Sequence, residues 1–266
     1  MVDAIPVLLY HSVPQADEGG DRLSVPYELF CSHMDAVIAS ERVPVSITQL
    51  ADGLRGRTRL PERSVAITFD DGFGNNLRAI EALATRGLRA TLYLTTGKSG
   101  SAELLTPRQI EALAQGTDYV EIGAHSVTHP YLDELEPMEV WAEVTHSKQH
   151  LEQLLGLQIR TFAYPYGALS GLVRELVVAA GFQSAAAVKN ALSHSADDPF
   201  AIARWTVGRA TSVQKLQELL SGRGAVRAWS GERLRTRGYR RARRLRRSVI
   251  GSARRATVAR LKEAHL

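Results

Sequence analysis

The chain has little cysteine and no long apolar run. Its 266 residues include one cysteine, Cys31, so an intrachain disulfide and a cysteine-rich zinc site are both excluded. We interpret Cys31 as a small apolar residue. No stretch approaches the roughly 18 uninterrupted apolar residues that a membrane-spanning helix needs. The sequence therefore predicts neither a disulfide scaffold nor a transmembrane segment.

The first ten residues also lack the pattern of a secretory signal. Asp3 precedes the short apolar run that ends at Tyr10, and no positive residue comes before that run. A signal peptide begins with positive charge and continues with a longer apolar segment. We therefore expect no signal peptide and a cytoplasmic start, with a first core strand at 5–10.

The charge is unevenly distributed in an otherwise ordinary globular composition. Hydrophobic residues make up 44% of the chain and charged residues 23%, and the length suffices for one large α/β domain with an appendage. From Arg223 onward the chain carries 15 of its 33 Lys and Arg but 2 of its 28 Asp and Glu. We therefore predict an acidic domain at 1–222 and a basic, arginine-rich tail at 223–266.

Short apolar runs alternate with amphipathic stretches along the domain. We predict strands at 5–10, 65–69, 90–94, 119–122, 159–163, 182–187 and 204–207, and helices at 76–86, from 106 onward, at 137–155 and at 169–180. Strand and helix in alternation predict a parallel sheet, either open or closed into a barrel. In such folds the chemistry lies at the carboxyl ends of the strands.

Two adjacent carboxylates, Asp70 and Asp71, follow the predicted strand 65–69 and precede Gly72. Like charges side by side at a strand end repel unless a cation or a proton offsets them. A metal ion would do so, with one carboxylate as its ligand and the other free to act as a base. Asp-Asp-Gly is also common in turns, so a plain turn is the alternative.

Two histidines, His125 and His129, come soon after the predicted strand 119–122. Residues four apart meet on one face of a helical turn or loop, and imidazole is the commonest neutral metal ligand. A pair of surface histidines is the alternative. With Asp71 as a third ligand from another strand end, the set leaves positions open for water and substrate.

Two further strand ends carry residues suited to a site. The segment 162–167, FAYPYG, is aromatic and stiffened by proline, so it can form a wall that stacks against a sugar ring. Its backbone N–H groups can serve as oxyanion donors, and a packed turn is the alternative. His11 ends the first strand, where a catalytic acid could lie, although a lone histidine there is more often structural.

Together these motifs resemble the polysaccharide deacetylases, the NodB-homology domain of carbohydrate esterase family 4. Asp-Asp-Gly, His-x-x-x-His and FAYPYG occur in this order within roughly residues 5–210. The opening LLYHSV is similar to the start of the branch that includes bacterial poly-N-acetylglucosamine deacetylases. The resemblance implies a distorted (β/α) barrel with fewer than eight regular units, here a catalytic domain at 1–222, followed by a helical or disordered basic tail.

The resemblance also implies a reaction and a role for each motif. The reaction is metal-dependent hydrolysis of the acetamide of an N-acetylated amino sugar in a polysaccharide, an oligosaccharide or a lipid-linked glycan. Asp70 is the general base, the backbone N–H of Tyr166 is the oxyanion donor, and the metal ligands are Asp71, His125 and His129. Zinc is the preferred divalent ion, while iron, cobalt and nickel also suit this ligand set.

The sequence departs from the family's commonest form in two places. Many members carry an arginine where Ala163 stands, and that arginine orients the base; Arg204 is our candidate for this role, ahead of Arg160. Many members also take the catalytic acid from a C-terminal Leu-x-His motif, which nothing after Arg204 matches. In the permuted branch the role is implied for the N-terminal histidine, here His11. Histidines that fit less well are His33, His146 and His150, in stretches with a helical pattern, and His194, in a polar loop of uncertain position.

Other functions and the role of the tail stay open. The missing arginine makes a catalytically weak or silent carbohydrate-binding relative the main alternative, and a nucleic-acid binder acting through the tail is disfavoured. In the tail, Ala242, Leu245 and Val249 recur at helical spacing among many arginines. Such a basic amphipathic helix is typical of a segment that lies on an anionic membrane, which would make the protein peripheral there. A solvated, partly disordered tail is the alternative.

Overall fold

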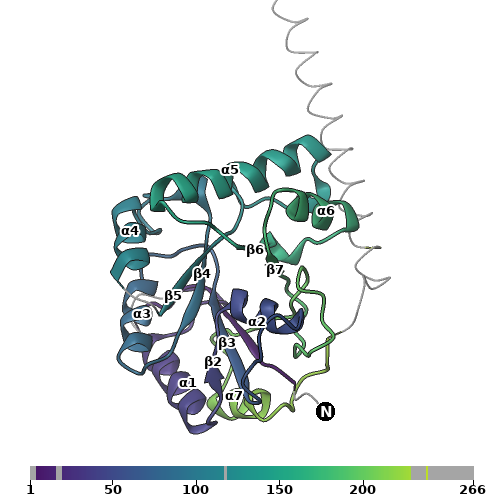
Figure 1. Cartoon of the computed structure of the whole chain (residues 1–266). Helices are drawn as coiled ribbons and strands as arrows, with labels where there is room; N and C mark the ends of the chain where they lie inside the picture. The colour runs from purple at the N-terminus through teal and green to yellow at the C-terminus, as the bar shows by residue number, and fades with distance from the viewer. Residues whose placement is uncertain (1–3, 16–19, 117–118, 229–237, 239–266) are drawn as a thin grey trace, which may run out of the picture.

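The structure is a computed structural model that describes residues 4–15, 20–116, 119–228 and 238 (Figure 1). Within these ranges no helix combines the length and the apolar character needed to cross a bilayer. Nearly all of the predicted tail, including its amphipathic pattern, lies outside the described residues. Its membrane binding therefore stays a prediction.

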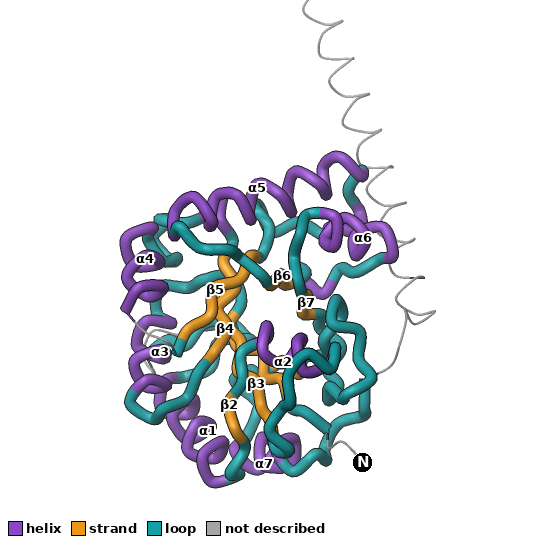
Figure 2. The backbone as a smooth tube through the Cα atoms, viewed as in Figure 1, coloured by secondary structure: helices purple, strands orange, loops and turns teal. Residues whose placement is uncertain are grey.

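A curled, all-parallel sheet forms the centre of the molecule (Figure 2). Its order is β7-β6-β5-β4-β3-β1-β8, and the short strand β2 pairs with β3 beside this path. The strands are β1 Val7–Tyr10, β2 Val43–Pro44, β3 Ser64–Phe69, β4 Ala90–Leu94, β5 Val120–Ala124, β6 Thr161–Ala163, β7 Ser184–Ala186 and β8 Trp205–Thr206.

The segment that leads into β8 joins the two edges of this sheet. Ile202 pairs in parallel with Ala186 of β7, and β8, three residues later, pairs with β1. The strands thus close into a ring through one stretch of chain, on which Arg204 lies. This is the distorted (β/α) barrel with fewer than eight regular units that the family resemblance implies.

Helices surround the barrel, with α1, α3, α4, α5 and α6 arranged along its outside (Figure 1). The helices of the described residues are α1 Tyr27–Ala39, α2 Ile47–Leu54, α3 Asn76–Ala84, α4 Pro107–Gly116, α5 Pro137–Leu155, α6 Gly171–Ala179 and α7 Val213–Leu220. Three short 3-10 helices add to them: η1 Thr96–Lys98, η2 Leu132–Glu134 and η3 Pro165–Gly167.

Alternate residues of the strands face two apolar layers, as the period of two along a strand requires. Leu8 and Ile67 belong to the layer between the sheet and the outer helices, whereas Val7 and Ala66 pack inside the barrel. Helix α2 fills the interior from the amino ends of the strands, where Ile47 joins the inner cluster. The carboxyl ends are left for the polar residues.

Most predicted elements occur where expected, with shifted ends. Pro6 has no N–H to donate, so β1 begins at Val7, after the Ile5 position that the sequence predicts. Helix α6 begins at Gly171 because the Ser170 hydroxyl accepts from a first-turn N–H. Gly156, with a φ of 65°, ends α5 as predicted.

Candidate active site

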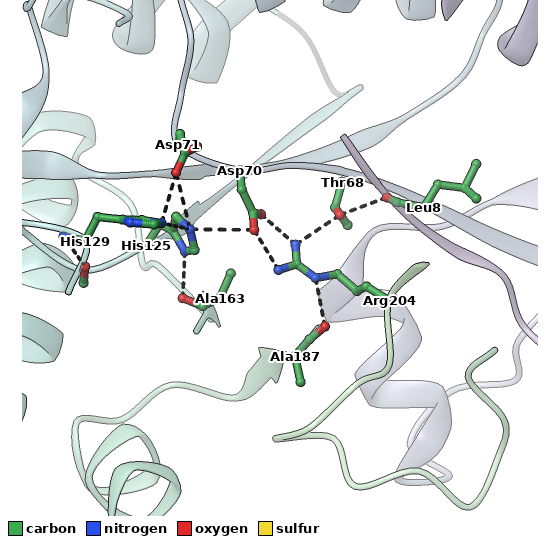
Figure 3. A network of polar contacts seen from close by, with 10 residues as sticks. Leu8, Thr68, Asp70, Asp71, His125, His129, Ala163, Ala187 and Arg204 are labelled. Carbon is green, nitrogen blue, oxygen red and sulfur yellow. Dashed lines mark hydrogen bonds and ion pairs between the residues drawn. The ribbon is translucent and has the colours of Figure 1, made fainter. Parts of the chain in front are cut away.

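The strand ends bring most of the predicted site residues to one end of the barrel. Asp70 and Asp71 follow β3, His125 follows β5, and His11 follows β1. Figure 3 shows the two aspartates beside His125 and His129, with Arg204 reaching Asp70 from the opposite side. Because β1, β3 and β5 are parallel strands of one sheet, their carboxyl ends lie at the same edge.

Three side-chain atoms converge as a metal-binding set. The Nε2 atoms of His125 and His129 are 3.1 Å apart. Asp71 Oδ1 lies 3.2 Å from His129 Nε2 and 3.6 Å from His125 Nε2. Within the described parts of the chain, this trio is the one group of three or more His, Cys, Asp or Glu positioned to hold a metal ion.

The backbone selects the tautomer of His125. Its Nδ1 lies 2.8 Å from the carbonyl oxygen of Ala163, which can only accept, so Nδ1 carries the proton and Nε2 keeps its lone pair. Burial lowers the pKa of His125 to about 3, although the charge of Asp70 opposes this. The ring is therefore neutral at pH 7, with its ligating nitrogen facing His129 and Asp71.

Asp71 and His129 are held in an uncommon backbone conformation. Their φ angles are 72° and 62°, in the left-handed region that residues other than glycine seldom adopt. Burial and the neighbouring charge of Asp70 raise the pKa of Asp71 to about 6. A cation between the three side chains would offset that repulsion and satisfy both imidazole lone pairs, so the residues present fit a divalent metal.

A buried ion pair fixes Asp70. Arg204 donates from Nη1 to Oδ1 at 2.6 Å and from Nη2 to Oδ2 at 2.8 Å, and both side chains are almost fully buried. Nε of Arg204 donates to the carbonyl of Ala187, and Nη1 also reaches the Thr68 hydroxyl. Burial would raise the pKa of Asp70, but the charge and hydrogen bonds of Arg204, together with smaller contributions from neighbouring histidines, lower that pKa to about 2. Asp70 is therefore ionised across the neutral range.

His11 borders a cleft beside the ligand set. The cleft has a volume of about 630 Å³, and His11, Asp71, Phe73 and Asn75 are among its lining residues. His11 Nδ1 is buried without a hydrogen-bond partner among the described residues. Asn75 accepts from the Val13 N–H and donates to the Ser12 hydroxyl, so it ties the loop after β3 to the loop that carries His11. Nothing in the sequence pattern predicts these hydrogen bonds of Asn75.

Tyr166 lies in an aromatic group at the rim of the site. The residue is 56% exposed; its ring stacks on Tyr131 with centroids 4.0 Å apart and makes an edge contact with the His129 ring at 4.5 Å. Tyr166 also has a left-handed φ, of 56°. Sequence reasoning missed Tyr131, which lies between the loop that carries His129 and the 3-10 helix η2.

The other candidates considered for these roles lie elsewhere. Arg160 is exposed just before β6, at the far end of that strand from the site. His194 follows Ser193, which pairs with Ile5 before β1, so it too lies near the amino ends of the strands. His33 is buried between the Tyr10 hydroxyl and the carbonyl of Thr211. His146 and His150 are exposed on the surface of α5.

Comparison of the sequence with known proteins gives matches to polysaccharide deacetylases. Residues 57–185, which include all three candidate ligands, Asp70 and Tyr166, match the family model described as polysaccharide deacetylase. YxkH of Bacillus subtilis (strain 168), whose name places it among the polysaccharide deacetylases, is 27% identical over 180 residues. That match covers 67% of this chain and 62% of YxkH, less than two thirds of its length.

Two solved structures share the fold. The Streptococcus pyogenes deacetylase PplD, in complex with acetate, superposes with a TM-score of 0.74 at 21% identity, over 81% of this chain and 97% of that one. IcaB from Ammonifex degensii gives a TM-score of 0.70 at 22% identity, over 84% and 98% of the two chains. The family match and the motifs above show that residues 57–185 resemble the polysaccharide deacetylases, and the two structures show that the chain shares their fold.

Proposed function

We propose that the chain is a metal-dependent N-deacetylase that hydrolyses the acetamide of an N-acetylated amino sugar in a polysaccharide, an oligosaccharide or a lipid-linked glycan. One observation carries the proposal: Asp71, His125 and His129 converge beside a second carboxylate that Arg204 holds apart from them. A ligand set next to a separately anchored carboxylate is the arrangement that hydrolysis by an activated water requires.

The proposed metal ligands are Asp71 Oδ1 and the Nε2 atoms of His125 and His129. Two imidazoles and a carboxylate favour zinc, and they also suit iron, cobalt or nickel. When bound, the ion would acidify a water molecule and polarise the amide carbonyl. Three protein ligands leave room for both of these oxygens.

Asp70 is the proposed base. Its Oδ2 lies 3.6 Å from His125 Nε2, so the carboxylate borders the ligand set. Arg204 keeps it ionised and fixes both of its oxygens, which aims it at a water held at the ligand set. A carboxylate with a pKa of about 2 is a weak base, so it suits a water that is already acidified.

His11 and Tyr166 complete the proposed mechanism. His11, in its protonated form, donates to the leaving amine nitrogen, which is a poor leaving group until it is protonated. The Tyr166 backbone N–H donates to the oxyanion, and its exposed ring with Tyr131 offers a face for a sugar. His11 and Arg204 lie outside the segment that matches the family model, so their roles rest on their position in this structure.

Metal analysis combined with acetate release tests the function. The full chain would be assayed on N-acetylated oligosaccharides, including poly-N-acetylglucosamine fragments, and on lipid-linked sugars. We expect one metal per chain, acetate release from at least one substrate class, and a sharp fall in both after Asp71→Ala, His125→Ala or His129→Ala. Stoichiometric metal without acetate release would favour the silent carbohydrate-binding relative, and full metal content in all three variants would refute the site.

The tail forms a separate proposal, that 223–266 binds an anionic membrane surface. Residues 226–228 hydrogen-bond to Leu192 in the barrel, so a truncation after Ala228 leaves those contacts intact. Co-sedimentation with vesicles of anionic lipid should be lost in this truncated chain and weakened by salt. Unchanged binding would refute the proposal, and stronger binding to nucleic acid than to vesicles would favour a nucleic-acid binder that acts through the tail.

A further inference from the structure

The two histidines of the candidate metal site are held by different means. The His125 ring is 1% exposed and anchored through Nδ1 to the carbonyl of Ala163. The His129 side chain is 15% exposed, and its backbone N–H donates to the hydroxyl of Ser126 at 3.0 Å. The position of His129 therefore depends on the loop 126–129, in which Ser126 and His129 both have left-handed φ angles.

One side of this loop is fixed by η1, the 3-10 helix after β4. The Thr96 N–H donates to the carbonyl of Ser126 at 3.2 Å, and the Gly97 N–H donates to the carbonyl of Val127 at 2.8 Å. A side chain at Gly97 would meet the Val127 oxygen at 2.7 Å, so the two backbones are in close contact. These bonds satisfy the carbonyl groups of the loop.

The other side is fixed by Glu143, near the middle of α5. Its Oε2 accepts from the backbone N–H groups of Val127 and Thr128, both at 2.8 Å, and its Oε1 accepts from the Thr128 hydroxyl at 2.6 Å. Hydrogen bonds to an ionised carboxylate are about twice as strong as neutral ones. Both oxygens of Glu143 therefore accept hydrogen bonds from the loop, and Glu143 is not one of the candidate metal ligands.

We propose that Glu143 is a positioning residue that sets the metal affinity of the site by holding His129 in place. This rests on the metal site of the proposed function and adds a residue that is not a ligand. Without Glu143, the N–H groups of Val127 and Thr128 lose their partners, and the strained conformation of the loop loses its support on one side. His129 then samples orientations that do not ligate, whereas His125 stays fixed through its own ring.

Zinc binding to the full chain tests this inference, measured by competition with a chromophoric chelator. Glu143→Ala should weaken Zn²⁺ binding by about tenfold, the lower end of the range for residues that orient ligands. Glu143→Gln should recover most of the affinity, because its amide oxygen can accept from both N–H groups and its amide N–H₂ can donate to the Thr128 hydroxyl.

Glu139 provides the matched control. It lies one turn earlier on α5, and its carboxylate accepts from the N–H of Glu136 rather than from the loop. Glu139→Gln and Glu143→Gln each remove one negative charge from nearly the same place. If Glu143 acted only by attracting the cation, the two glutamine variants and Glu143→Ala would all weaken zinc binding alike, which would overturn the proposal.

A double-mutant cycle identifies the histidine through which Glu143 acts. In a His129→Ala background the effect of Glu143→Ala on zinc affinity should disappear, whereas in a His125→Ala background it should persist. Equal effects in both backgrounds, or wild-type affinity in Glu143→Ala, would refute the positioning role. Failure of the proposed function gives a different result, which is tight zinc binding without acetate release. Thermal unfolding of the metal-free variants checks that lost affinity is not lost folding.

Discussion

Replacing Arg204 by methionine would leave a carboxylate buried without its counter-charge. The guanidinium is completely buried and pairs with both oxygens of Asp70, which is 2% exposed. Methionine replaces the apolar stem of the arginine out to about the position of Nε, so the variant loses the charge, the hydrogen bonds and the packing of the outer guanidinium atoms. The pH dependence of the loss separates the electrostatic contribution from the packing contribution.

The expected loss of folding free energy at pH 7 is ~3–5 kcal/mol, the usual range when one partner of a buried ion pair is removed. The pKa of Asp70 agrees with this order of magnitude. A fall from the ordinary value of 3.8 to about 2 corresponds to roughly 2 kcal/mol of favourable interaction in the native protein. The variant loses that interaction and in addition keeps the desolvation penalty of Asp70.

The loss should depend on pH in a defined direction. In the wild type the folded-state pKa of Asp70 lies below its unfolded value, so the stabilisation is present above about pH 4 and is lost as the pH falls towards 2. In Arg204→Met burial would instead raise the pKa of Asp70, so the penalty exists above pH 4 and disappears on acidification. The difference between the two proteins should thus be largest near pH 7 and shrink towards pH 3.

Urea unfolding of the metal-free full chain at pH 7, 5 and 4 measures this difference. Asp70→Asn combined with Arg204→Met removes both charges and should recover part of the loss at pH 7, while Arg204→Lys should fall between wild type and Arg204→Met because it cannot make both bonds. A stability difference that is independent of pH, or no recovery in the double variant, would refute the reasoning.

Three further predictions concern the chemistry. Asp70→Asn should keep the metal while turnover falls by about two to four orders of magnitude, and near-normal turnover would show that Asp70 is not the base. His11→Ala should keep metal and fold and lose more activity on an N-acetyl substrate than on an aryl acetate, whose leaving group needs less protonation; equal losses would argue against an acid role. Zinc affinity should fall below about pH 6 with the uptake of one proton, because Asp71 becomes protonated there. Burial keeps His125 neutral down to about pH 3 and also lowers the pKa of His129, so the histidines should not add a second proton. A dependence on two protons between pH 6 and 5 would contradict this assignment.

The sequence predicts the strand ends well because each carries a signal in its own side chains. A buried apolar run followed by Asp70-Asp71 or by His125 marks both the strand and its functional end. The glycine at 156 likewise marks the end of α5. Helices α2 and α7 are not among the predicted elements, because each has eight residues, fewer than the window of roughly 11–18 residues over which an apolar period is read.

The supporting contacts of the site could not be predicted in the same way. The partner of His125 is a backbone carbonyl, that of Ala163, which any residue would supply. Glu143 binds backbone N–H groups of a loop that comes before its helix, and glutamate is an ordinary residue on a helix surface. Such contacts depend on how two elements pack, and the residue types involved do not reveal them. The resemblance makes Arg204 a candidate because it implies an arginine that orients the base. The two hydrogen bonds from Arg204 to Asp70 depend on the pairing that closes the barrel, which the sequence does not reveal.

The position of Arg204 on the segment that closes the barrel also orders the assembly of the protein. All three candidate ligands and Asp70 precede Arg204 along the chain, so during synthesis the ribosome releases them first. A nascent chain that has not yet docked the segment from Ile202 to β8 has an open sheet edge and an unneutralised Asp70 in its centre. Docking of this segment removes both defects at once. The same stretch of chain thus completes the sheet and balances the charge of Asp70, and a chain that ends before residue 204 would lack both.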